Sequence, residues 1–259
     1  MSSRDTGLTL MIGILAAIVG YILWQLTIGL DTKVTDISAI LSNSASGATI
    51  ITISTILISV GLVVHAAGLI STRGTASGTW ETLGIISVVA AIAIWVTTSG
   101  LGIALVKMGE QFVAASTGAA QAAAAAQAAA AAGNAAGAAE AGAAAQGAVA
   151  AATSIGIAAG FTQATSVASS TIGSLLAGIG WICIGVAYRG SDAKGALSFI
   201  PLGWLALLAG LILVVANLVI NQVVSTELGS QISGIAFLLI VLWSVLRGIA
   251  LIQDSKQKA

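Results

Sequence analysis

Charged side chains are scarce in this sequence, and their scarcity decides its class. Only 7% of the 259 residues are charged, whereas 58% are hydrophobic and the mean hydropathy is +1.06. Soluble domains carry roughly a quarter charged residues, so this composition cannot supply a water-soluble surface. The nine basic residues are balanced by nine acidic ones, which leaves no basic excess for nucleic acid. The sequence therefore predicts an integral membrane protein that contacts the lipid bilayer and has no nucleic-acid partner.

Residues that hold metals or carry out catalysis are equally few. The chain has one cysteine, Cys183, and one histidine, His65. One residue of each type cannot assemble the usual zinc, copper or bis-histidine haem site. Phosphate-binding loops, nucleophile elbows and zinc-binding helix motifs are also missing. We therefore predict a non-catalytic protein without metal or cofactor. His65 is kept as a candidate for cofactor binding, because an ionisable group inside a membrane span is often functional.

Six segments are apolar over about the 20 residues that a membrane-spanning helix needs. They lack the two-residue alternation of a membrane β-barrel. The segments are Leu8–Leu30, Thr49–Ile70, Leu83–Val106, Thr171–Tyr188, Pro201–Val223 and Ile232–Leu251. The predicted fold is an all-α, polytopic membrane bundle of six transmembrane helices with an alanine-rich helical hairpin on the outer side. Residues 1–110 would hold the first three helices, residues 111–165 the alanine-rich insert and residues 166–259 the last three helices.

Basic residues predict the orientation of this bundle. With six spans both termini lie on one side, and that side carries seven of the nine basic residues: Arg4, Arg73, Arg189, Lys194, Arg247, Lys256 and Lys258. The other side carries Lys33 and Lys107. Basic residues favour the cytoplasmic side, so we predict a plasma-membrane protein with both termini in the cytoplasm. Arg247 is expected to snorkel to the inner interface, and Tyr188 to join Trp204 in the aromatic belt.

The alanine-rich insert, residues 111–165, is predicted to be a helical hairpin. Alanine is the strongest helix former, and Gly133-Asn134 provides a stop because both residues tolerate the left-handed conformation. Polar side chains at Gln121, Gln127, Glu140 and Gln146 disfavour burial in lipid. This favours a hairpin outside the membrane over two membrane-buried arms, and a partly ordered loop is a further alternative.

Small residues predict where helices touch. Glycine lets two helix backbones approach closely in lipid. We therefore predict helix contacts at Gly61, Gly68, Gly178, Gly180 and Gly185. Such contacts favour association with other membrane subunits or with a second copy of the chain. We therefore predict a structural or accessory subunit of a larger membrane assembly.

The alternative function is a channel or small-solute transporter. Polar residues near the outer ends of two spans would then line a wet vestibule, namely Thr97, Thr98, Asn217 and Asn221. Such groups also act as hydrogen-bonding links between helices. A parallel repeat of helical hairpins would support transport, since a shift of 117 residues places Gly61 and Gly68 on Gly178 and Gly185.

Overall fold

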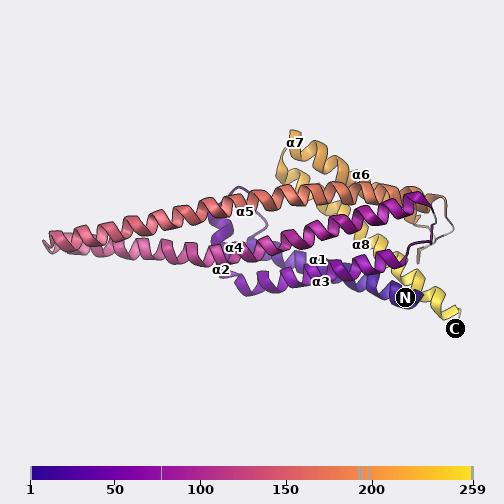
Figure 1. Cartoon of the computed structure of the whole chain (residues 1–259), viewed down its shortest axis with the longest axis horizontal. Coiled ribbons are helices and arrows are strands. Elements are labelled where there is room, and N and C mark those ends of the chain that lie inside the picture. The colour runs from indigo at the N-terminus through magenta and orange to yellow at the C-terminus, as the bar shows by residue number, and fades with distance from the viewer. Residues whose placement is uncertain (1, 77, 192, 194, 198, 258–259) are drawn as a thin grey trace. The chain divides into compact units, whose positions relative to one another are not determined.

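All regular secondary structure is helical in the residues that a computed structural model describes, which are 2–76, 78–191, 193, 195–197 and 199–257. Lys194 and Lys258, used above for orientation, lie outside these ranges. The helices are α1 (Ser3–Ile28), α2 (Ile37–Ser46), α3 (Ala48–Ser71), α4 (Thr79–Ala131), α5 (Ala135–Arg189), α6 (Leu202–Val215), the π-helix η1 (Ala216–Ile220), α7 (Asn221–Val223) and α8 (Thr226–Gln257) (Figure 1). No strand occurs among the described residues, which agrees with the predicted all-α class.

Six helical segments are long and apolar enough to cross a membrane, as predicted. They are Ser3–Ile28, Ala48–Ser71, Thr79–Ala131, Ala135–Arg189, Leu202–Val223 and Thr226–Gln257. The third and fourth are much longer than expected, because the alanine-rich insert does not begin a new helix. Between Val106 and Gly133 no proline interrupts the chain, so α4 continues from the apolar span into the alanine run. The protein is thus a multi-pass integral membrane protein.

Two compact units divide these helices. The bundle unit comprises Met1–Ile22, Ser54–Ser99 and Val167–Ala259, and the hairpin unit comprises Leu23–Ile53 and Gly100–Ser166. Each unit has its own buried apolar side chains, so each is described by itself below.

Glycine contacts hold the bundle unit together. A methyl group on Gly61 of α3 would lie 2.7 Å from the Gly13 carbonyl oxygen and 2.6 Å from the Ala17 nitrogen of α1. On Gly185 of α5, it would lie 2.6 Å from the Leu207 nitrogen of α6. These distances are too short for any side chain, so the helix backbones themselves are in contact. The bundle therefore depends on glycine at its crossing points, as small-residue packing in membranes does.

Aromatic side chains fill the space where the bundle helices separate. Trp181 and Trp243 are each 1% exposed, and their rings meet edge to face with centroids 5.0 Å apart. Tyr188 packs on Trp243 in the same way at 5.4 Å, and Trp95 of α4 packs on Phe237 of α8 at 5.3 Å. Edge-to-face pairs of this kind add to the stabilisation from burial, so these rings fix the spacing of α4, α5 and α8.

A short helix absent from the sequence prediction organises the hairpin unit. In α2, Asp36 is the N-cap, and its carboxylate accepts a hydrogen bond from the Ala39 N–H at 3.0 Å. Buried Ile40 and Leu41 pack with Leu105 of α4 and Ala159 of α5. The α2 helix thus packs its apolar side chains against α4 and α5.

We predict that Gly185→Ala destabilises the protein by about 1–3 kcal/mol, because the added methyl group would collide with backbone atoms of α6. The matched control is Gly234→Ala in α8, where a methyl group meets nothing within 4 Å. That change should be neutral or stabilise by up to about 1 kcal/mol through helix propensity. Thermal unfolding in detergent measures both variants, and equal melting temperatures would contradict the packing role of Gly185.

Candidate functional site

The turn between α4 and α5 is a three-residue connection, Ala132–Asn134, that ends one helix and begins the next. Gly133 has a φ of 72°, and its N–H donates to the Ala130 carbonyl while the Asn134 N–H donates to the Ala129 carbonyl. This is the Schellman pattern of a helix C-terminus. The Asn134 side chain also accepts from the Gly137 N–H at 2.9 Å, so it caps α5. The predicted helical hairpin is therefore present, and the partly ordered alternative is wrong.

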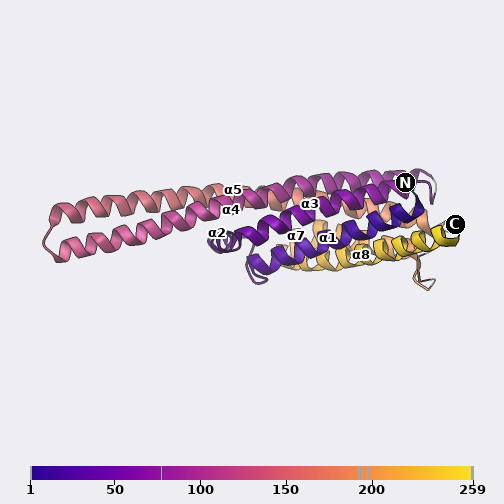
Figure 2. The same cartoon turned by 90° about the horizontal axis from the view of Figure 1, so that it is seen from below.

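The two arms of the hairpin run side by side in both views (Figures 1 and 2). Along each arm, one series of partly or fully buried positions recurs at alternating spacings of three and four residues. On α4 these are Met108, Phe112, Ala115, Ala119, Ala122, Ala126 and Ala129, and on α5 they are Ala138, Ala141, Ala145, Ala148, Ala152, Ile155, Ala159 and Thr162. This is the heptad pattern of a coiled coil. The arms thus form an antiparallel seam made almost entirely of alanine.

The outward faces of the arms carry almost no charge. Glu140 is the only charged residue between 111 and 166, and Gln121, Gln127 and Gln146 are exposed on the same surface. Alanine covers most of the remainder, together with exposed Val149, Ile157 and Phe161, of which Phe161 is 73% exposed. Exposed apolar surface of this extent marks a region that contacts protein or lipid.

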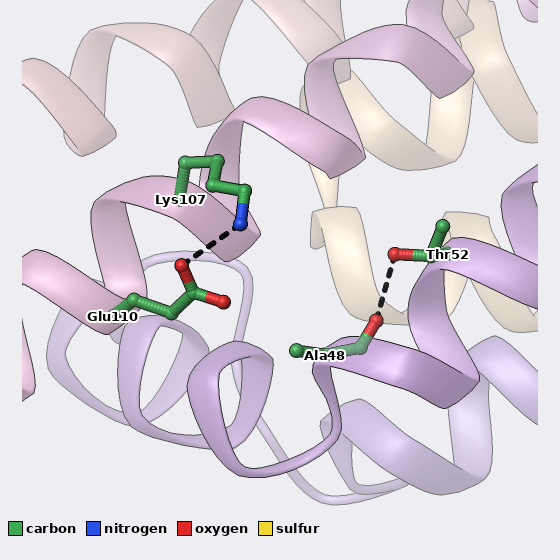
Figure 3. Close-up of polar contacts among 4 residues, drawn as sticks. All are labelled: Ala48, Thr52, Lys107 and Glu110. Atoms are coloured by element: carbon green, nitrogen blue, oxygen red, sulfur yellow. Dashed lines mark hydrogen bonds and ion pairs between the residues drawn. The ribbon is translucent and has the colours of Figure 1, made fainter.

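Polar side chains near the arms are satisfied locally and leave this surface unchanged. Figure 3 shows the Lys107–Glu110 ion pair of α4, with Nζ and Oε2 3.0 Å apart. It also shows the Thr52 hydroxyl donating to the Ala48 carbonyl of its own helix at 2.8 Å. Both contacts join residues three or four positions apart on one helix, so they link no other element.

Four arm glycines have no neighbour that requires them. A methyl group on Gly118, Gly142, Gly147 or Gly156 would meet no atom within 4 Å. None has a positive φ. Glycine inside a helix costs about 0.5–1 kcal/mol relative to alanine. In the bundle unit the five glycines predicted for packing, Gly61, Gly68, Gly178, Gly180 and Gly185, all lie against another helix backbone. These four hairpin glycines thus have room for a side chain, whereas the five bundle glycines do not.

The four residues considered for a polar vestibule fall into two groups. The Thr97 and Thr98 hydroxyls donate to the Ala93 and Ile94 carbonyls of their own helix at 2.9 and 2.8 Å. Asn217 and Asn221 lie together, with the Asn221 side-chain amide donating to Oδ1 of Asn217 at 3.1 Å. Asn217 is buried and donates to the Ser233 hydroxyl of α8 at 3.2 Å. The asparagines therefore link the end of α6 to α8.

His65 lies at the crossing of α3 with α1. The imidazole is 2% exposed, and its Nδ1 lies 3.1 Å from the Leu10 carbonyl oxygen. A carbonyl only accepts, so Nδ1 carries the proton and donates, which leaves Nε2 as the acceptor. Nε2 is buried without a hydrogen-bond partner. No group of three or more possible metal ligands occurs in the described ranges, so a cofactor role for His65 stays a prediction.

A buried charged cluster at one end of the bundle unit was missed by sequence reasoning. Glu81 of α4 is 1% exposed, and its carboxylate accepts from the Gly74 N–H at 2.7 Å and the Ala76 N–H at 3.0 Å. Tyr188 interacts electrostatically with both Glu81 and Arg247. Tyr188 is 4% exposed and Arg247 is 5% exposed. The expectations that Arg247 snorkels and that Tyr188 lies in the aromatic belt are therefore wrong.

The burial of Arg247 and Tyr188 was not predicted because the residues that cover them are distant in the sequence. Arg247 and Tyr188 lie close to the ends of their spans, and a hydropathy profile assigns such residues to the interface. Their burial depends on packing between helices, such as that of Tyr188 on Trp243. No signal within either span reports that contact.

Comparisons with protein-family models, curated proteins and solved structures give no match. The function is therefore argued from the surfaces described above.

We predict that Glu81→Ala destabilises the bundle unit by about 1.5–3 kcal/mol, because two backbone N–H groups lose a charged acceptor. The α3–α4 connection should also be cut faster by trypsin at exposed Arg73. The control is Glu110→Ala, which removes an exposed ion pair worth less than about 1 kcal/mol. Unchanged cleavage at Arg73 in the Glu81 variant would show that the carboxylate does not hold this connection.

Proposed function

We propose that this protein is a non-catalytic structural or accessory subunit of a larger membrane assembly, and that the alanine-rich hairpin is the surface by which it associates. The observation that carries this proposal is the outward face of residues 111–166, which is small, apolar and almost free of charge. Its partner would be another membrane subunit or a second copy of the chain.

The seam alone gives the hairpin little stabilisation from burial. Stabilisation scales with apolar area at roughly 25 cal/mol per Å², and an alanine methyl group contributes little area. Each arm nevertheless presents a continuous helix to its surroundings. Because so much of its apolar surface is left uncovered, the hairpin gains most from a neighbour that packs against it.

The open glycines favour a protein neighbour. Gly118, Gly142, Gly147 and Gly156 weaken their helices without any contact in the chain that uses them. A second helix that approached these positions would reach the backbone directly, as α6 reaches α5 at Gly185. Lipid chains need no such clearance, so glycine at these positions supports helix association.

The orientation proposed for this subunit puts both termini in the cytoplasm of a plasma-membrane protein and the hairpin turn outside. Support comes from the basic residues, because Arg73 lies in the α3–α4 connection and Arg189 ends α5. Lys107, by contrast, lies within α4 and is paired with Glu110. Basic side chains at helix ends favour the cytoplasmic face.

A channel or small-solute transporter is the second candidate, and one feature favours it. The π-helix Ala216–Ile220 interrupts the fifth span, and Oδ1 of neighbouring Asn221 is buried without a hydrogen-bond partner. π-Helical turns occur often at functional sites. Solute flux into liposomes that hold only this chain would favour transport, whereas liposomes as tight as protein-free ones would count against it.

To test the assembly role, we would shorten each arm by two heptads, deleting residues 119–132 and 135–148. The deletion retains Gly133-Asn134 and the seam register, because fourteen residues are two full repeats. We expect the particle extracted from its native membrane in mild detergent to exceed the 25.4 kDa of one chain. The shortened protein should be inserted normally but run as a single chain. A shortened protein that keeps the full particle mass would contradict the proposed role.

A second test replaces the four open glycines, Gly118, Gly142, Gly147 and Gly156, by alanine together. We expect the hairpin helices to become more stable, by about 0.5–1 kcal/mol per site. The assembly should instead dissociate at lower detergent concentration, because methyl groups would separate the helices. Circular dichroism and particle mass measure the two effects. If the variant's helices and its assembly both became more stable, no partner backbone would be packed against these glycines.

A further inference from the structure

Close contact between α5 and α6 brings one exposed arginine onto one exposed tryptophan. A methyl group on Gly203 of α6 would lie 2.6 Å from the Arg189 nitrogen at the end of α5. The next residue, Trp204, is 54% exposed, and the Arg189 guanidinium carbon lies 4.1 Å from the centre of its ring. The glycine contact thus sets the position of a cation–π pair at the surface of the bundle unit.

The stacked guanidinium keeps its hydrogen-bonding capacity. A guanidinium donates in its own plane, so a ring against its face leaves N–H groups at its edge for an acceptor. Within the described ranges no carboxylate lies at ion-pair distance from Arg189. Arg189 is therefore an exposed, oriented cation, and its planar fork matches the oxygen atoms of a phosphate group.

Exposed apolar side chains in the preceding connection indicate that the phosphate would belong to a phospholipid. In the connection that leads to α6, Phe199 is 77% exposed and Leu197 is 42% exposed. Trp204 itself lies in the first turn of the span Leu202–Val223. Tryptophan at the end of a span occupies the headgroup region of the bilayer. A ligand here meets a cation and apolar groups together, as a phospholipid does.

We propose that Arg189 and Trp204 form a binding site for the phosphate of an anionic phospholipid, whose acyl chains lie along exposed apolar side chains of α6 such as Leu208 and Leu211. The site is independent of the alanine-rich hairpin and of the assembly proposed above. It binds one lipid in a defined place, whereas unpaired basic residues elsewhere attract anionic lipid without fixing it.

Native mass spectrometry of the full chain in detergent tests the site. Phosphatidylglycerol is titrated in one arm and diacylglycerol with the same acyl chains in another. We expect tighter binding of phosphatidylglycerol, and a loss of about tenfold or more in its affinity for Arg189→Gln, because the charge-assisted hydrogen bonds from the guanidinium to the phosphate are lost. Trp204→Leu should also weaken binding, because the leucine keeps the apolar character but no longer orients the guanidinium.

The matched control is Arg73→Gln, which removes another exposed arginine at a span end. Its affinity for phosphatidylglycerol should stay that of the unaltered chain. An equal loss in the Arg73 and Arg189 variants, or none in the Arg189 variant, would overturn the site. Inorganic phosphate at millimolar concentration is added as a competitor, and displacement of the lipid by it would overturn the assignment to a phospholipid.

Discussion

Direct contact between helix backbones is the constraint on which this structure depends. In lipid, helices gain nothing from hiding apolar side chains from water, so their association rests on close packing. Glycines provide it between α1 and α3, between α5 and α6, and between α4 and α5. In the α4–α5 contact, a methyl group on Gly84 or Gly180 would lie 2.7–2.8 Å from the other glycine's carbonyl oxygen. Larger residues at these points would separate the helices and expose the aromatic cluster of Trp181, Tyr188 and Trp243.

Close packing of the helices also determines where buried polar side chains form hydrogen bonds. Closely packed helices leave no room for water, so a buried hydroxyl must find an acceptor on its own helix. The Thr98 hydroxyl does this with the Ile94 carbonyl, and the Ser244 hydroxyl with the Ile240 carbonyl. Other buried polar side chains bond beyond their own helix. His65 pairs with the Leu10 carbonyl, Asn217 donates to the Ser233 hydroxyl, and Glu81 accepts from backbone N–H groups of the α3–α4 connection.

Hydropathy alone predicted the six spans and the all-α class, because both depend only on composition along the chain. The turn at Gly133-Asn134 was also predictable, since a left-handed glycine and a capping asparagine act locally. The α2 helix was missed although Asp36 is a standard N-cap, because its ten residues are too few for a periodic signal. The burial of Tyr188 and Arg247 could not be predicted, since it depends on packing between helices that are distant in the sequence, such as that of Tyr188 on Trp243.

The two units use small residues for opposite purposes, and this difference bears on function. In the bundle unit Gly61, Gly180 and Gly185 each meet a backbone of the same chain. In the hairpin unit alanine forms the seam, yet Gly118, Gly142, Gly147 and Gly156 face open space. A surface without bulk or charge selects a partner by shape, because it has few groups for hydrogen bonding. The partner must therefore present a helix that is equally free of large side chains along the line of contact.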